Sequence, residues 1–220
     1  MRIAGLSKLT TIDFPGRLAC ILFTAGCNYD CGFCHNRSLL YTDTLLDEDE
    51  VWSFLRKRAG QLEGVVISGG EPTLQWDLED AARRIRSLGY AVKLDTNGSN
   101  PETLERLLSA ELLDYVAMDY KAPFRRYLEI CGKDAAGVEE SLALLFGSGV
   151  PFELRTTVIP ELKAGDMVEM AGSGPALPRY YLQLFRSVPG YERATLYKRG
   201  DLASFREMIL PAQPNAQLRF

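Results

Sequence analysis

The stretch Cys20-Ile-Leu-Phe-Thr-Ala-Gly-Cys-Asn-Tyr-Asp-Cys-Gly-Phe-Cys-His-Asn36 decides the fold of this chain. Its first four residues, 20–23, form an apolar run that is typical of a buried strand. The run leads into a loop that carries Cys27, Cys31 and Cys34, three of the five cysteines of the chain. Thiols placed this densely, with three and then two residues between them, indicate metal binding or redox chemistry.

Three thiolates are one ligand short of the four that usually hold an iron–sulfur cluster. A cubane cluster bound by these three would keep one iron open to a small molecule. A structural zinc ion with His35 as fourth ligand is the alternative, although such sites usually take their ligands from two separated pairs. A disulfide fits less well, because an odd number of clustered cysteines without a secretory signal suits a reducing cytoplasm.

Composition limits the classes of function. The 220 residues are 46% hydrophobic, enough for one domain with a sizeable core. The net charge of −4 and the lack of a dense basic run argue against nucleic-acid binding. No apolar stretch approaches the ~20 residues that span a bilayer, and Met1 leads directly into a strand-like segment. We therefore expect a cytoplasmic protein without a membrane partner. The single histidine, His35, excludes mechanisms that need two.

Strand and helix patterns alternate along the rest of the chain. Five further segments read as short buried strands, at 64–68, 91–95, 115–119, 152–159 and 179–185. Helical patterns cover 47–59, 74–88, the segment after the Asn100 cap, 137–146, 164–170 and 201–209, the last with Asp201 as its cap. Six strands separated by helices predict a parallel sheet. A doubly wound sheet is less consistent with this sequence, because no Gly-x-Gly-x-x-Gly motif follows any predicted strand. We therefore favour a partial (β/α)6 barrel.

We expect a single domain over residues 1–220. Residues 1–19, with a turn at Pro15-Gly16, predict a lead-in hairpin. The partial barrel covers 20–190, and a C-terminal helix and tail cover 191–220.

The unusual motifs follow directly after predicted strands. In a βα barrel these strand ends meet at one face, where active sites are built. Gly69-Gly70 lets the backbone approach a ligand closely, and Glu71 adds a carboxylate that can hold an ammonium group. The alternative is a tight turn with Glu71 facing solvent.

Charged residues end the third and fourth predicted strands. Asp95 and Asp119 could bind a cation, and Lys121 could pair with the carboxylate of a bound amino acid. The alternative is a salt bridge that only stabilises the fold. Of the remaining cysteines, Cys20 is expected to pack in the core and Cys131 to have no role.

The motifs together resemble the radical S-adenosylmethionine superfamily. Within it they resemble the activating enzymes of glycyl radical enzymes, and most closely the activating proteins of anaerobic ribonucleoside-triphosphate reductases. The matching segments are 12–16, 27–36, 67–73, 93–98 and 116–123, spread over roughly residues 1–190.

The resemblance implies a cofactor set and a reaction. A 4Fe-4S cluster would bind S-adenosyl-L-methionine, and its reductive cleavage would give a 5′-deoxyadenosyl radical. That radical would take a hydrogen atom from a glycine of a partner, a glycyl radical enzyme. Flavodoxin or ferredoxin would supply the electron.

Site residues are assigned through the resemblance, by position. Cofactor contacts fall on Phe33, His35, Gly69, Gly70, Glu71, Asn97, Asp119 and Lys121. A monovalent cation would lie at Asp95, Thr96 and Asp119, and the glycine loop of the partner near Asp13 and Arg155. Some relatives place a cofactor-contacting histidine late in the barrel, where this chain has Gln183 and Arg186 as replacements.

Two other functions stay open at this point. One is a radical enzyme that acts on a small molecule in cofactor or modified-base synthesis. The other is a non-enzymatic module that binds zinc or a cluster.

Overall fold

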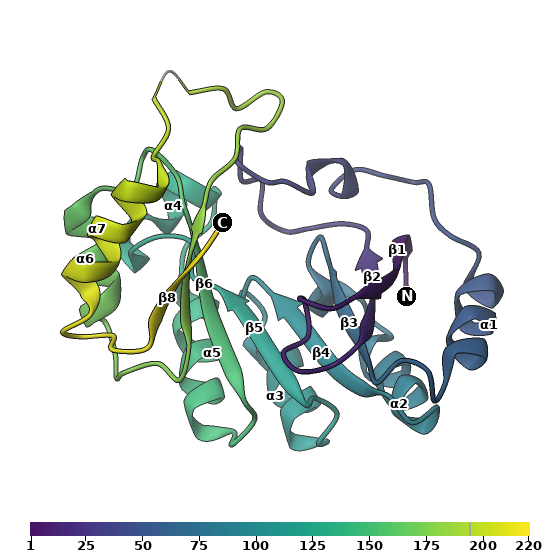
Figure 1. Cartoon of the computed structure of the whole chain (residues 1–220). Coiled ribbons are helices and arrows are strands. Elements are labelled where there is room, and N and C mark those ends of the chain that lie inside the picture. Colours follow the sequence, from purple (N-terminus) through teal and green to yellow (C-terminus); the bar gives the residue numbers. More distant parts are fainter. Residues whose placement is uncertain (194) are drawn as a thin grey trace.

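A mostly parallel sheet of eight strands forms the centre of the molecule in a computed structural model, which describes residues 1–193 and 195–220 (Figure 1). The strands follow one another in chain order, and only the first runs antiparallel to its neighbour. They are β1 Ile3–Thr10, β2 Ala19–Thr24, β3 Gly64–Gly69, β4 Ala91–Thr96, β5 Tyr115–Asp119, β6 Phe152–Val158, β7 Tyr180–Leu184 and β8 Ala216–Arg219. Because β1 and β8 are the two edges, the barrel is open between them.

Helices connect successive parallel strands and cover one face of the sheet (Figure 1). They are α1 Glu48–Arg58, α2 Leu78–Ser87, α3 Pro101–Ser109, α4 Tyr127–Cys131, α5 Ala136–Gly147, α6 Ala164–Gly172 and α7 Arg199–Ile209, with short 3-10 turns at η1 Arg37–Leu39, η2 Pro72–Leu74 and η3 Phe124–Arg126. No helix in the described part of the chain combines the length and apolar character needed to cross a bilayer.

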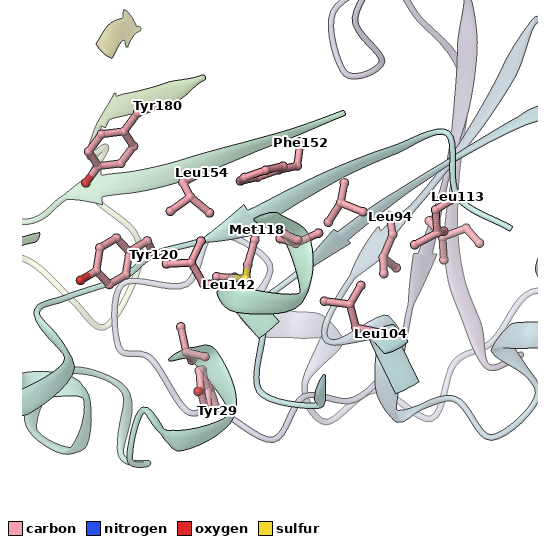
Figure 2. Packing of buried hydrophobic residues seen from close by; sticks show 14 of the residues in the cluster. Tyr29, Leu94, Leu104, Leu113, Met118, Tyr120, Leu142, Phe152, Leu154 and Tyr180 are labelled. Carbon is pink, nitrogen blue, oxygen red and sulfur yellow. The ribbon is translucent and has the colours of Figure 1, made fainter. Parts of the chain in front are cut away.

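The two faces of the sheet bury different cores. Alternate strand residues such as Leu94, Met118 and Leu154 pack with helix residues such as Leu104 and Leu142 in the main core (Figure 2). On the other face Phe14 from the lead-in segment joins Ile21, Val66 and Tyr115 in a second, smaller core. Strands buried on both faces read as continuous apolar runs, which is why their sequences identify them so clearly.

The predicted fold class is confirmed, because the six predicted parallel strands are β2 to β7, next to one another in the sheet. The hairpin of β1 and β2 is also present, with the amide of Arg17 bonded to the carbonyl of Phe14 at 3.1 Å across the turn. The tail, unassigned from sequence, supplies β8 and extends the sheet beyond the predicted six strands.

Two helix starts differ from the sequence prediction. The second helix begins at Leu78 rather than Leu74, because Gln75 is extended there and its side chain donates to the carbonyl of Ala25 at 3.0 Å. The last helix has Lys198 as N-cap, and Asp201 lies in the first turn, where it accepts from the amide of Lys198 at 2.7 Å.

Strand register decides which side chains meet at the carboxyl end of the sheet. Asp119 of β5 is paired with Arg155 of β6, and Asp95 of β4 with Ala117 of β5. Side chains two residues apart share a face of a strand, so Asp95, Asp119 and Arg155 all point to the face opposite the helices.

The tail that forms β8 is tied to the body of the protein by Gln213, which is almost completely buried. Its Nε2 donates to the carbonyls of Ala171 at 2.8 Å and Pro175 at 3.3 Å, and its Oε1 accepts from the amide of Leu177 at 2.8 Å. One side chain therefore satisfies three backbone groups.

Replacing Gln213 by Ala should lower the free energy of unfolding by about 2–3 kcal/mol, because buried backbone groups lose their partners. Urea unfolding followed by circular dichroism measures the change. Gln217→Ala, at an exposed position of β8, is the control and should change it by less than about 0.5 kcal/mol. Equal losses in both variants would contradict this role of Gln213.

Candidate active site

A cavity of about 490 Å³ opens at the carboxyl ends of the parallel strands. Its lining includes the three clustered cysteines and the polar residues that follow β3, β4 and β5. Of the residues assigned to the site from sequence, the structure places these around it: Asp13, Cys27, Cys31, Phe33, Cys34, His35, Gly69, Gly70, Asp95, Thr96, Asn97, Asp119, Lys121, Arg155 and Gln183. Glu71 is the assigned residue that does not line the cavity, and Arg186, the other candidate on the sixth predicted strand, is exposed.

The three cysteines present unpaired thiols to this cavity. The Sγ of Cys27 receives hydrogen bonds from the amide of Tyr29 at 3.4 Å and from Nδ2 of Asn97 at 3.8 Å. N–H groups directed at sulfur stabilise a thiolate that ligates iron. Burial raises the pKa of Cys27 to about 11, so this thiol loses its proton at neutral pH only when a metal binds it. The donor set therefore fits an iron–sulfur cluster.

A single zinc ion fits less well. Across residues 1–193 and 195–220, no three His, Cys, Asp or Glu side chains converge on one ion position. His35 instead packs its ring against Phe185, with 5.9 Å between the centroids. A cubane holds its ligands on separate irons, so the thiols need not meet at one point.

A segment that follows β7 covers the outer side of the cysteine loop. The Tyr191 ring lies on Gly32, where an added Cβ would be only 2.7 Å from its Cδ2. The same ring packs against Phe33 and Phe185, at centroid distances of 6.1 and 5.6 Å. The guanidinium carbon of Arg193 also lies over this ring, 3.6 Å from its centroid. Position 32 is therefore a glycine because an aromatic ring occupies the space of a side chain.

The Gly69-Gly70 turn packs directly against the cysteine loop. A Cβ on Gly70 would be 2.0 Å from the carbonyl oxygen of Gly26, and Gly69 has φ +113°. The amide of Gly70 donates to the carbonyl of Thr24 at 2.9 Å. The two glycines thus bring the loop and the turn together at the wall of the cavity.

Glu71 neither faces solvent nor lines the cavity, so its position does not support direct binding of an ammonium group by its carboxylate. It is completely buried and accepts four hydrogen bonds: from the hydroxyl of Thr73 at 2.6 Å and its amide at 3.1 Å, from the hydroxyl of Thr96 at 2.7 Å, and from the amide of Asn97 at 2.6 Å. These four hydrogen bonds satisfy the Glu71 carboxylate. Through them the carboxylate links the loop after β3 to the loop after β4. Thr96 likewise directs its hydroxyl to Glu71.

Asp95 and Asp119 are joined by Arg155, which the resemblance had assigned to the partner. Its Nη1 lies 3.1 Å from Asp95 and its Nε 3.1 Å from Asp119, and Lys121 binds Asp119 at 2.9 Å. Burial by itself would raise the pKa of Asp119, but Lys121 and Arg155 outweigh it and lower that pKa to about 2. The salt bridge left open from sequence is therefore present, with Arg155 as an added member. A monovalent cation at these carboxylates stays a prediction.

Two neighbours of the site were missed from sequence. Cys131 is buried beside Cys31, and its thiol favours the Cys31 thiolate, which lowers the pKa of Cys31. Nothing local signals a contact between residues so far apart in the chain. Lys93 is buried beside Asp95. The sequence feature that could have identified it is a single lysine inside the apolar strand Ala91–Thr96. Cys20, by contrast, lies in the core as predicted.

Comparison with known proteins supports the interpretation of the cysteine loop as a cluster-binding motif. Residues 21–173 match the model of the Radical SAM superfamily. The chain belongs to the radical S-adenosylmethionine superfamily. Membership implies a 4Fe-4S cluster and S-adenosyl-L-methionine, which the residues around the cavity fit.

Individual relatives are named for different reactions. A Methanocaldococcus jannaschii protein provisionally named a glycyl-radical enzyme activating enzyme is 32% identical over 86% of this chain and 82% of its own length. A Thermococcus kodakarensis protein named a probable GTP 3′,8-cyclase is 30% identical over 88% of this chain but only 62% of its own length. Streptococcus suis SuiB, solved with a precursor peptide, has a TM-score of 0.73 at 16% identity over 91% of this chain and 48% of SuiB. This last likeness is one of fold.

Changing Cys27, Cys31 or Cys34 to Ala should abolish cluster assembly, because each supplies one of three ligands. Anaerobic reconstitution followed by iron analysis measures this, with about four irons per chain in the wild type. Cys20→Ala is the matched control and should keep the full iron content, since Cys20 lies in the apolar core. A Cys31→Ala protein with an intact cluster would refute the ligand assignment.

Gly32→Ala should destabilise the reconstituted protein by about 1–3 kcal/mol, because the new methyl group overlaps the Tyr191 ring. Adding Tyr191→Ala should recover part of the loss by removing the overlap. Urea unfolding of the single and double variants measures this. Gly165→Ala, in α6 with open space around it, is the control and should cost nothing. A double variant no more stable than Gly32→Ala would show that the two residues are not coupled.

Proposed function

We propose that this radical S-adenosylmethionine enzyme activates a glycyl radical enzyme by removing a hydrogen atom from a glycine of that partner. The observation that carries the proposal is the match to the Methanocaldococcus jannaschii protein, which extends over most of both chains. The cyclase-named relative has more than a third of its length outside the match. Anaerobic ribonucleotide reductase is the partner that the motifs favour.

A bound 4Fe-4S cluster together with S-adenosyl-L-methionine would supply the radical chemistry. Cys27, Cys31 and Cys34 would hold the cluster. Lys121 lines the cavity with an ammonium group that can bind the carboxylate of the methionine part. His35 and Gln183 lie on the wall where the adenosyl part would rest. A low-potential donor, flavodoxin or ferredoxin, would provide the electron.

The lead-in hairpin supports a protein as the substrate. Asp13 lines the cavity, with its carboxylate bonded to the hydroxyl of Thr10. Next to it Ile12 is 80% exposed, and Leu9 and Leu18 in the same hairpin are also exposed. Ile12 thus offers an exposed apolar side chain directly next in sequence to a residue of the cavity wall, which suits a protein loop that covers it on binding.

A small-molecule substrate is the second candidate. The relative named as a probable GTP 3′,8-cyclase favours it, because the match covers 88% of this chain. The two candidates differ in product: a protein-bound glycyl radical in the first case and a modified small molecule in the second.

Asp13→Ala should reduce activation of the partner at least fivefold more than it reduces release of 5′-deoxyadenosine without partner, because Asp13 belongs to the lead-in hairpin and is not one of the proposed cluster ligands. A fivefold difference corresponds to about 1 kcal/mol. Electron paramagnetic resonance of the glycyl radical doublet, at limiting partner, measures activation. The control is Asp49→Ala, at an exposed position of α1.

An undiminished doublet from Asp13→Ala would remove Asp13 from the partner site. Absence of the doublet with wild-type enzyme and every glycyl radical enzyme of the same genome would overturn the proposed function. Consumption of a nucleotide by the same preparation would then favour the second candidate.

A further inference from the structure

Five charged side chains form one continuous network across β4, β5 and β6. Their order is Lys93, Asp95, Arg155, Asp119 and Lys121, so that each carboxylate lies between two cations. Four of the five line the cavity. Lys93 does not, and only 1% of its side chain is exposed, against 13–33% for the other four.

The two oxygens of the Asp95 carboxylate bind different partners. Lys93 binds Oδ1, which leaves Oδ2 for Nη1 of Arg155 at 3.1 Å and for the hydroxyl of Ser68 at 3.2 Å. Arg155 in turn uses Nε for Oδ1 of Asp119 at 3.1 Å. Its Nη2 has no hydrogen-bond partner in the described part of the chain, although Arg155 lines the cavity.

Burial of the Lys93 ammonium group is energetically unfavourable. Removing an ammonium group from water costs several kcal/mol, and a single carboxylate often fails to offset that cost. An apolar side chain of similar length would fill the same space beside the Tyr115 ring, whose centroid is 5.9 Å from Nζ. The sequence nevertheless has a lysine. Among the described residues, the one carboxylate within ion-pair distance of its Nζ belongs to Asp95, which also binds Arg155.

We propose that Lys93 is a positioning residue, which holds Asp95 so that Arg155 presents its free Nη2 to the substrate. Nη2 is a donor, and three cations face two carboxylates in the network. The group recognised at this point is therefore an electron-rich oxygen, a peptide carbonyl or a carboxylate. On the proposed function, on which this step rests, it is a backbone carbonyl of the glycine loop.

The first test needs no partner. In reconstituted enzyme labelled with ¹⁵N, the Nε–Hε signal of Arg155 reports its contact with Asp119, and Arg155→Lys assigns it. Lys93→Met should shift this signal and speed its exchange with water by about tenfold, because the guanidinium loses a fixed neighbour. Lys8→Met, an exposed lysine in β1, is the matched control and should leave it unchanged. An unchanged Arg155 signal in Lys93→Met would overturn the proposal.

Asp95→Asn keeps the test valid if Lys93→Met does not fold. This substitution weakens the contact between residue 95 and Arg155 directly, so it should change the Arg155 signal in the same way. The double variant should be no worse than Asp95→Asn alone, since Lys93 acts only through Asp95. A double variant with a clearly larger effect, or an unchanged signal in Asp95→Asn, would overturn the proposal.

The second test uses the partner. Lys93→Met should raise KM for the partner about tenfold, equal to 1.4 kcal/mol, with kcat changed less than KM. A loss confined to kcat would contradict a role in presenting Arg155 to the substrate. If wild-type enzyme activates no glycyl radical enzyme, the proposed function fails, while the Arg155 signal still decides the role of Lys93.

Discussion

The Arg155 guanidinium, shared between Asp95 and Asp119, holds the carboxyl ends of β4, β5 and β6 in one arrangement. Two carboxylates this close would repel each other, and each is tolerable because it also binds a lysine. The pKa of Asp119 in the folded protein, about 2, lies below the value of about 3.9 in an unfolded chain. Its contribution to stability is therefore complete at neutral pH and is lost as pH falls from about 4 toward 2.

The cysteine loop depends on contacts from outside itself. Gly26 and Gly32 have no side chains, and the Gly69-Gly70 turn and the Tyr191 ring pack against the loop at these points. Asn97 reaches from the end of β4 to the thiol of Cys27. Segments far apart in the chain thus shape the loop that offers three thiols to a cluster. This explains why a short motif needs a whole partial barrel around it.

Much of this architecture follows from the sequence alone. Apolar runs and helix caps locate β2 to β7, because local propensity and hydrophobic periodicity act over a few residues. The cysteine spacing identifies the cluster loop for the same reason. Motifs at strand ends predict a shared site, since parallel strands direct their carboxyl ends to one face. The predicted site residues line the resulting cavity, apart from Glu71 and the alternative candidate Arg186.

Tertiary structure decided what each of those side chains touches. Glu71 turns inward because donors from Thr73, Thr96 and Asn97 surround its carboxylate. Arg155 reaches from β6 to Asp119 on β5 and to Asp95 on β4. The contact of Cys131 with Cys31 and the pairing of β8 with β7 join residues distant in sequence. A local pattern specifies the type of element and its exposed end, whereas such contacts depend on register and on the space left by neighbouring side chains, which exist only once the sheet has formed.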